Sequence, residues 1–379
     1  MKKGILTALI ILSGLISTCA LGFGQIIENP AKPKAANSGR VVVPEEIFAI
    51  SDEGTSEYYF NYPYSLRTGA DGSLVLRDRD QILWFNRDGK LLHNLFKKGQ
   101  GPGEMQYPGD CLFVEEHIVV YAGNERKLVY FDRNGNFEKE LSVTSQDHTL
   151  ALLHHLPGTY FFKATEFPRT SGDPKIVETP QTIVSLAESD GSLRPLSSFA
   201  AKVYVVTSGG GGGSISITSL ITAPFKNTLL ALAHTEEYLV KIYDFAADRV
   251  THEFRRAYDR VKAEPLTDEQ KKRYIYINGK YYYPPELKYQ NDIKNILASN
   301  SSIWVVTSAK DKAKGVLLDI FDENGVYRDC IWLKLPEPAL AGIVSPGRSA
   351  LGGDYLWIVE KAEDETFMIK KYRVSSIHR

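Results

Sequence analysis

Residues 118–141 carry the sequence IVVYAGNERKLVYFDRNGNFEKEL, in which short apolar runs alternate with polar turns. The runs Ile118–Tyr121 and Leu128–Phe131 are rich in β-branched and aromatic residues and have the length of strands. Asn134-Gly135 follows the second run, and Asn-Gly between two such runs is the strongest local signal for a hairpin. The stretch therefore predicts three strands joined by tight turns.

The same order of elements returns along the chain. Residues 74–95, LVLRDRDQILWFNRDGKLLHNL, repeat it closely, with the turn Asn86–Gly89 in the place of Asp132–Gly135. Four weaker copies follow, and one more apolar segment precedes each copy, so that the chain predicts six units of four short strands. The expected second strands begin at residues 74, 118, 160, 229, 303 and 356, and the expected first strands are Tyr64–Leu66, Cys111–Phe113, Leu150–Leu152, Leu220–Ile221, Ile293–Leu297 and Ala341–Val344.

The spacing of these units indicates a propeller. The first two intervals are 44 residues (74 to 118) and 42 residues (118 to 160), close to the period of about 40 to 45 residues that is typical of a four-stranded blade. The later intervals are longer and predict insertions. A pair of β-sandwiches is the alternative, because sandwich strands recur at similar spacing, but repetition of whole four-strand units favours blades packed around a channel.

We therefore expect an all-β protein, a six-bladed β-propeller with four antiparallel strands per blade, over residues 41–379. A propeller must close its ring, often by an N-terminal strand that completes the last blade. Val41–Val43 or Ile47–Ile50 is expected to have that role, since the last blade ends in a short strand near residues 368–374.

Residues 99–135 resemble a known family. The segment GQGPGEMQYPGD (99–110), an apolar strand and the stretch that begins at Ile118 resemble the NHL repeat of six-bladed β-propellers. They are also similar to the related bacterial, extracytoplasmic "6-bladed β-propeller" proteins. The resemblance is good in the second unit and partial in the first and fifth, and it implies the fold rather than an activity. The matching positions are Gly99, Gly101, Gly103, Pro108, Asn124, Arg126, Phe131-Asp132 and Gly135.

The N-terminus has the composition of a secretory signal. A basic segment, Met1–Lys3, precedes the apolar segment Ile5–Ile16, and small residues follow at Gly22 and Gly24. We expect residues 1–24 to be a cleaved signal peptide and residues 25–40 to be a linker, because the latter are rich in proline, alanine and small polar residues.

This N-terminus predicts an extracytoplasmic location, periplasmic or secreted. Lipid anchoring at Cys19 is the alternative, although Thr18 fits poorly where a lipoprotein signal usually has Gly or Ala. No other apolar stretch is long enough to cross a bilayer, so no membrane span is expected after cleavage.

The charge of the chain limits the kinds of binding partner to be expected, and the positions of its cysteines bear on whether a disulfide can form. The chain has 45 basic and 46 acidic residues, a formal net charge of −1, so no overall field favours nucleic acid or an anionic membrane. Cys111 falls in the second unit and Cys330 in the fifth. Strands of non-adjacent blades are too far apart for a disulfide, so two buried free thiols are expected.

The insertions point to a binding surface. In a four-stranded blade, the connections from strand two to three and from strand four to the next blade emerge on one face, which we call the long-loop face. Connections beyond about 12 to 15 residues are uncommon unless they are functional or disordered. We expect this face to bind a protein, peptide or glycan of the cell envelope, because nearly all extra length falls on it: residues 96–110, 164–181, 198–218, 256–290 and 336–341.

Two of these segments have distinctive composition. Gly99, Gly101 and Gly103 could bind an anion through backbone amides or let a ligand approach closely, or they could form a fixed turn between blades. The insert 256–290 predicts a short helix from the capping box at Thr267–Gln270. Its tyrosines, among them Tyr281, Tyr282 and Tyr283, could stack on sugar rings or bases, engage an extended peptide, or pack onto the propeller.

The turns from strand two to strand three bring polar side chains towards the channel mouth. Six turns that converge on one axis can build a polar site that no local motif reveals, although most such charges are solvated or paired with neighbours. The candidate ligand-binding residues from these turns are Arg77, Arg79, Asn124, Arg126, His234, Lys310 and Glu360.

Two functions from different classes follow. The first is a non-catalytic binding or scaffold propeller without cofactor or catalytic residues. The alternative is a metal-assisted lactonase or lyase with its site at the channel mouth and a divalent ion such as calcium, since six-bladed propellers of that kind carry carboxylates, amides or histidines there. No HExxH, comparable metal spacing or GxSxG elbow occurs in the sequence.

Overall fold

The computed structural model describes residues 26–144, 149–166, 168, 173–208, 211–265, 275–277, 279–299 and 301–374. The expected signal peptide with Cys19 and the expected helix after Thr267 lie outside these ranges. Within them, no helix is long and apolar enough to cross a membrane.

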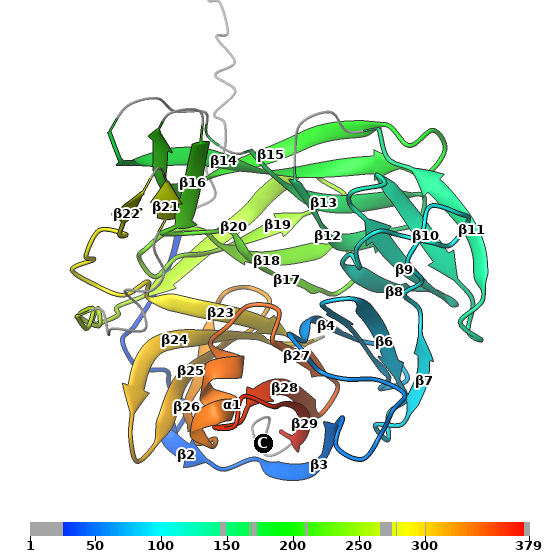
Figure 1. Ribbon diagram of the computed structural model, residues 1–379. Helices are drawn as coiled ribbons and strands as arrows, with labels where there is room; N and C mark the ends of the chain where they lie inside the picture. Colours follow the sequence, from blue (N-terminus) through cyan, green and yellow to red (C-terminus); the bar gives the residue numbers. More distant parts are fainter. Residues whose placement is uncertain are drawn as a thin grey trace, which may run out of the picture.

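Six antiparallel sheets stand around a common axis (Figure 1), as the sequence predicts. Each sheet contributes one blade, and within each blade the first strand lies nearest the axis. The strands of blades one to three are β4 (Tyr64–Thr68), β5 (Leu74–Asp78), β6 (Gln81–Phe85) and β7 (Leu91–Asn94); β8 (Cys111–Val114), β9 (His117–Ala122), β10 (Lys127–Phe131) and β11 (Phe137–Ser142); and β12 (Thr149–Leu156), β13 (Thr159–Thr165), β14 (Lys175–Ala187) and β15 (Leu193–Ser208), to which β16 (Gly211–Ser216) is added.

The other three blades follow the same plan. Their strands are β17 (Ile221–Phe225), β18 (Leu229–Ala233), β19 (Val240–Asp244) and β20 (Arg249–Arg256); β23 (Ile293–Ala298), β24 (Ile303–Asp311), β25 (Gly315–Phe321) and β26 (Tyr327–Leu333); and β27 (Ser349–Gly352), β28 (Tyr355–Lys361), β29 (Phe367–Arg373) and β3 (Glu45–Ser51). The second strand of every blade begins within one residue of its predicted start, since period-two runs bounded by Gly, Asn and Asp turns are a strong local signal.

An N-terminal strand closes the ring. β3 pairs antiparallel with β29, for example Ile50 with Ile369, and becomes the outermost strand of blade six. Of the two expected closing segments, Ile47–Ile50 is therefore the one that completes the last blade, and Val41–Val43 is not.

The expected linker, residues 25–40, is in part regular structure, which corrects that expectation. β1 (Ile26–Asn29) pairs parallel with β20 of blade four, and β2 (Arg40–Val42) pairs parallel with β26 of blade five. The outer strand of a blade leaves one row of backbone N–H and C=O groups unpaired, and the N-terminal segment pairs with that row on two successive blades. The composition of residues 25–40 did not reveal these two strands, because a strand that pairs with the edge of a sheet can be only three or four residues long.

The prediction that Ala341–Val344 form the first strand of blade six is wrong. These residues lie in and directly after helix α1 (Glu337–Ile343), and the first strand of that blade is β27. Ala339, Leu340 and Ile343 are buried at helical spacing, and a Cβ at Gly342 would come within 2.2 Å of the Val359 carbonyl oxygen. The small residues of this segment let a helix lie close against β28, which an apolar count cannot distinguish from a strand.

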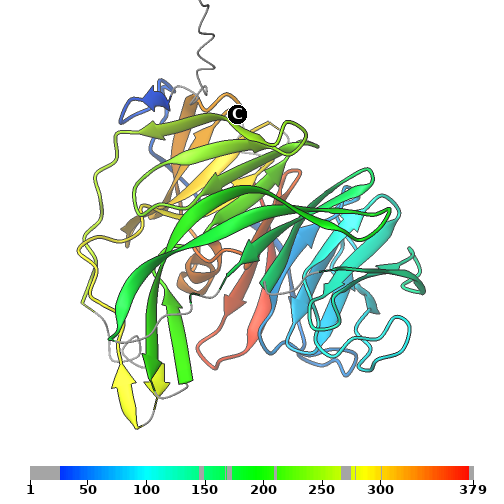
Figure 2. The same cartoon turned by 90° about the horizontal axis from the view of Figure 1, so that it is seen from above.

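Blade three corrects the expectation that residues 164–181 and 198–218 are loops. β14 and β15 continue far past the ring as a paired ribbon, with Lys175 opposite Val205, and β16 extends it. Figure 2 shows this ribbon leaving the ring with the hairpin β21 (Ile275–Ile277) and β22 (Lys280–Tyr282) beside it. Gly211, Gly212 and Gly213 belong to this ribbon through their pairing with β15, and a Cβ at Gly213 would come within 2.6 Å of the Ile275 side chain in β21.

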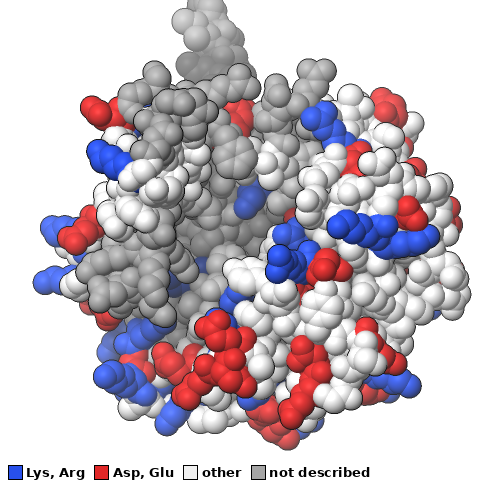
Figure 3. Space-filling model, viewed as in Figure 1, with Lys and Arg blue, Asp and Glu red and all other residues white. Residues whose placement is uncertain are grey.

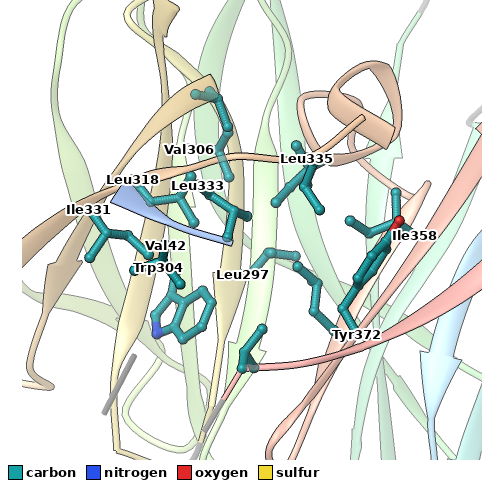
Figure 4. Close-up of a cluster of buried hydrophobic side chains, with 14 of the residues drawn as sticks. Val42, Leu297, Trp304, Val306, Leu318, Ile331, Leu333, Leu335, Ile358 and Tyr372 are labelled. Carbon is teal, nitrogen blue, oxygen red and sulfur yellow. The ribbon is translucent and has the colours of Figure 1, made fainter. Parts of the chain in front are cut away.

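The core is divided among the junctions between blades. Six clusters of buried apolar side chains each join two neighbouring blades, and a seventh joins the ribbon of blade three to β21. Figure 4 shows the junction of blades five and six, where Trp304 and Val306 of β24 face Ile358 and Tyr372 of blade six. A blade buries its faces only between two neighbours, so the ring is the stable unit.

Cys111 and Cys330 are free and buried, as predicted. They lie in blades two and five, in β8 and β26. Burial raises the pKa of the Cys111 thiol to about 12, so it is held as the neutral thiol.

Candidate functional site

All long connections emerge on one face of the ring, the long-loop face seen in Figure 1. The connections on the other face, such as residues 69–73, 115–116 and 157–158, are short hairpin turns. In the space-filling view of the long-loop face, basic side chains gather beside the depression at its middle (Figure 3).

Two adjoining hollows lie on this face over blades six, one and two. One has a volume of about 370 Å³ and lies over the starts of β4, β8 and β12. The other has a volume of about 830 Å³ and lies between the start of β4 and the connection from β28 to β29. Tyr62 and Tyr64 line both, so the two form one depression, which we call the mouth groove.

The sequence predicted three residues of the mouth groove. Arg77 at the end of β5, Arg79 in the turn after it, and Asn124 in the turn after β9 all line the smaller hollow. They meet because the two-to-three turns of neighbouring blades lie side by side around the axis. Arg126, also predicted from the turn after β9, is exposed and has a positive φ of 52°.

Two tyrosines of the groove carry an arginine on one ring face. The Arg77 guanidinium carbon lies 4.1 Å from the centre of the Tyr64 ring, and that of Arg348 lies 4.4 Å from the centre of the Tyr62 ring. Tyr62 is 56% exposed, and Tyr107, which also lines the smaller hollow, is 65% exposed. Large aromatic side chains this exposed are typical of recognition surfaces rather than of a closed core.

Asp110 lies at the floor of the groove. It accepts a hydrogen bond of 3.0 Å from the Ser65 hydroxyl. Burial, followed by the nearby Asp110 carboxylate, raises the pKa of Tyr64 to about 12. Burial likewise raises the pKa of Tyr121 to about 12. The floor therefore presents one carboxylate beside phenols that keep their protons at neutral pH.

A buried carboxylate holds one wall of the groove in place. Asp78 is fully buried and accepts hydrogen bonds from the backbone N–H groups of Asn61 (2.8 Å), Tyr62 (2.6 Å) and Arg79 (2.6 Å). Burial raises the pKa of this carboxyl, and the three backbone hydrogen bonds act in the opposite direction. Sequence reasoning missed Asp78 as a positioning residue, since two of its three partners, Asn61 and Tyr62, belong to a connection that starts in another blade.

The glycine segment 99–103 does not present free amides to the groove. Gly101 N–H donates to the Glu104 carboxylate at 3.0 Å, and Gly103 N–H donates to the Glu140 carboxylate at 2.7 Å. Glu104 also pairs with Lys97 at 2.8 Å. The chain's own carboxylates thus occupy the positions that an external anion would take, in agreement with the fixed turn that was the alternative expectation.

His234 lies in a separate hollow of about 630 Å³ between the ribbon of blade three and blade four. Its Nδ1 is 3.0 Å from the Ala200 carbonyl oxygen, whereas its Nε2 is buried without a hydrogen-bond partner. Burial lowers the pKa of this imidazole. Lys202 forms a salt bridge with Glu236 (3.2 Å) in the same hollow, so these two charges of the hollow are paired within the chain.

The remaining predicted residues lie apart from the groove. Glu360 is buried, accepts a hydrogen bond of 2.5 Å from the Tyr372 hydroxyl and pairs with Lys370 at 3.2 Å, which indicates a structural role. Lys310 is exposed in β24. Tyr282 packs against the β15–β16–β21 cluster, whereas Tyr281 and Tyr283 of the same hairpin are about half exposed.

Among the described residues, no group of three or more His, Cys, Asp and Glu side chains could hold a metal ion. The divalent ion of the alternative function therefore has no assigned ligands, and that function stays a prediction.

Comparisons with known proteins bear on the fold. A family model described as a 6-bladed beta-propeller (DUF5128) matches residues 50–184. A provisionally named exported protein of Bacteroides fragilis NCTC 9343 has a similar structure, with a TM-score of 0.51 and 11% identity over 93% of this chain and 100% of its own. A DUF4221 family member from Bacteroides vulgatus ATCC 8482 has a TM-score of 0.50 and 10% identity over 89% of this chain and 99% of its own.

Other comparisons do not extend to function. The calcium-binding protein regucalcin of Agrobacterium tumefaciens aligns at a TM-score of 0.44 and 12% identity, over 88% of this chain and 97% of its own, a likeness too weak to bear on calcium. No curated protein matches the sequence. The finer resemblance to the NHL repeat stays a prediction. By its sheets, its family match and the solved structures that resemble it, the chain is a six-bladed β-propeller.

Proposed function

We propose that the protein is an exported, non-catalytic binding or scaffold propeller that recognises a protein, peptide or glycan of the cell envelope on its long-loop face. The mouth groove is the part of that face that takes the ligand. This assignment replaces the broader set of polar turns, because only some of those turns contribute to one depression.

The observation that carries the proposal is the pairing of exposed rings with cations in one depression. Tyr62 and Tyr107 offer large exposed rings, and Arg77 and Arg348 stand against neighbouring rings within the same groove. Tyrosine and arginine are the residues that most often dominate binding energy, because they combine a rigid apolar area with directional hydrogen bonds. The wall that carries Tyr62 is held by Asp78, so little order has to be gained on binding.

Export rests on the N-terminal sequence. The basic segment, the apolar segment and the small residues before residue 25 are what a secretory signal requires. Cleavage near residue 24 would leave β1 as the first element, already paired with blade four. The alternative of lipid attachment at Cys19 would place the same propeller at a membrane surface, and mass spectrometry of the protein from its native envelope separates the two.

Ligand capture from an envelope extract tests the proposed surface. Purified protein, the groove variants Tyr62→Ala and Tyr107→Ala, and the hairpin variant Tyr281→Ala are immobilised at equal density and incubated with the extract. We expect the groove variants to lose the captured species and the hairpin variant to keep it. Loss in Tyr281→Ala with full capture by both groove variants would move the binding surface to the insert, and equal capture by all four proteins would reject the long-loop face.

A further inference from the structure

We infer that the mouth groove binds an acidic glycan, a chain of sugar rings that carries carboxylate or sulfate groups. The inference rests on the proposed binding function and deepens it by naming the class of ligand. Its basis is a set of cations without carboxylate partners that stand beside exposed aromatic rings.

Three arginines of the mouth groove lack a carboxylate partner among the described residues. In the described part of the chain, Arg77, Arg79 and Arg348 have no carboxylate within salt-bridge distance. Buried arginines elsewhere in the protein are paired, as Arg256 is with Asp319 at 2.7 Å. Arg77 and Arg348 instead lie against the Tyr64 and Tyr62 rings. A guanidinium stacked on a ring keeps its N–H edge free for a carboxylate or sulfate, which it can bind through two parallel hydrogen bonds.

Two tyrosine rings of the mouth groove are exposed to solvent. Arg348 occupies one face of Tyr62, and 56% of this residue nevertheless remains exposed. Tyr107, which lines the smaller hollow together with Tyr62, is 65% exposed. The flat C–H face of a sugar ring stacks on such aromatic faces, and the phenol hydroxyls hydrogen-bond to sugar hydroxyls. Rings and guanidinium groups together fit a ligand that is flat, hydroxylated and anionic.

Basic side chains outnumber acidic ones in the lining of the mouth groove. The groove is lined by four basic residues, Arg77, Arg79, Arg348 and Lys361, and by the two carboxylates Asp110 and Glu365. Lys361 and Glu365 pair with each other at 2.8 Å. The lining of the groove thus has two more basic than acidic residues in a chain whose net charge is −1, and this local excess favours an anionic ligand.

An acidic peptide is the competing ligand, and the walls disfavour it. A bound extended peptide obtains much of its affinity from backbone hydrogen bonds to the edge of a sheet. The groove walls are built largely from connections, including residues 59–62, 107–109 and 345–348, and Pro108 and Pro346 within them have no N–H to donate.

Titration calorimetry with defined oligomers tests the inference. The probes are a tetragalacturonate, a chondroitin sulfate hexasaccharide, neutral cellotetraose and a polyglutamate peptide of similar charge. The proteins are the wild type, Arg77→Gln, Arg348→Gln, Arg79→Gln and Tyr107→Ala. Arg249→Gln is the matched control, because this arginine is exposed at the start of β20, where the strand leaves a short turn of the opposite face. Circular dichroism verifies the fold of each variant, and Arg79, which is exposed, keeps the test valid if Arg77→Gln unfolds.

We expect at least one acidic glycan to bind, more tightly than cellotetraose and with an affinity that falls as salt rises. Each groove arginine variant should weaken that binding by roughly tenfold or more, since each removes a charge-assisted hydrogen bond. Arg249→Gln should bind like the wild type.

Results that contradict these expectations have different consequences for the ligand class and for the groove. If neither acidic glycan binds, or if cellotetraose or polyglutamate binds better, the ligand class is wrong. If the cellotetraose or polyglutamate that binds better does not bind to Tyr107→Ala, the assignment of the groove and the proposed function still stand. If an acidic glycan binds all groove variants with unchanged affinity, both the inference and the assignment of the groove fail.

Discussion

Gly135 lies directly against the imidazole of His93, so closely that a Cβ added to the glycine would be 2.5 Å from the ring carbon Cγ. Gly135 closes the turn between β10 and β11 of blade two, and His93 belongs to the outer strand of blade one. Gly89 stands in the same relation to Phe48, and Gly325 to Phe254, each at 2.5 Å. The turn glycine of the repeat therefore packs one blade onto the outer strand of the blade before it.

Gly135→Ala should cost more stability than a left-handed glycine usually does. The positive φ of 74° alone costs an alanine about 1 kcal/mol, and the contact with His93 adds to that. Gly158→Ala is the control, because Gly158 has a φ of 78° but no atom within 4 Å of the added Cβ. Urea unfolding of both variants measures the difference. Equal losses would show that the blade contact contributes nothing.

Two adjacent arginines of β20 should differ sharply in their contribution to stability. Arg256 is buried, pairs with Asp319 at 2.7 Å and lies against the Tyr238, Tyr258 and Tyr327 rings. Removal of one partner of a buried pair costs about 3 to 5 kcal/mol, because the other charge stays buried. Arg255 forms an exposed pair with Glu28, and because solvent screens such a pair, its removal should change the stability far less.

Chemical denaturation of Arg256→Ala and Arg255→Ala checks this contrast. A loss for Arg256→Ala as small as that for Arg255→Ala would mean that Asp319 is satisfied by its two tyrosine hydroxyls alone.

The stability of the protein should decrease as pH falls through the range in which His234 titrates. Burial lowers the pKa of this imidazole in the folded state, so the unfolded chain binds its proton first as pH falls below about 6.5. The stabilisation is therefore fully present above the unfolded pKa and is lost as pH falls from that value to the lower folded pKa. A second proton would go to Nε2, which is buried without a hydrogen-bond partner.

Unfolding of wild type and His234→Asn at pH 7.5 and pH 5.0 measures this effect. Asparagine can still donate to the Ala200 carbonyl, so the variant should fold but lose less stability between the two pH values. The same loss in both proteins would assign the acid sensitivity to other groups.

Asp78→Asn should weaken ligand binding without a change at any ligand contact. The carboxylate accepts three backbone hydrogen bonds that hold the chain at Asn61, Tyr62 and Arg79, and an amide keeps only one accepting oxygen. We expect a stability loss of about 1 to 3 kcal/mol and affinity for the groove ligand several-fold below wild type. Calorimetry and thermal melting report the two quantities separately. Wild-type affinity in a destabilised variant would show that the wall needs no support from Asp78.

Much of the fold follows from local sequence. The sequence correctly predicts the second strand of each blade and the Asn-Gly and Asp-Gly turns, because these depend on residues near one another in the chain. It also correctly predicts that Cys111 and Cys330 lie in different blades. The errors occur where a distant segment decides. Residues 341–343 are helical against β28, and residues 175–182 and 198–205 are strands because each pairs with the other.

The residues of the mouth groove were likewise predicted only in part. Arg77, Arg79 and Asn124 were found from the sequence, because every two-to-three turn of a propeller points to one face. Tyr62, Tyr107, Arg348 and the supporting Asp78 were not, since they lie on connections from different blades or are buried beneath them. The sequence alone determined the six blades, because strand period and turn chemistry act over a few residues. Only the tertiary structure decided which rings and cations share one depression, because the closure of the ring brings together residues almost three hundred positions apart, such as Tyr62 and Arg348.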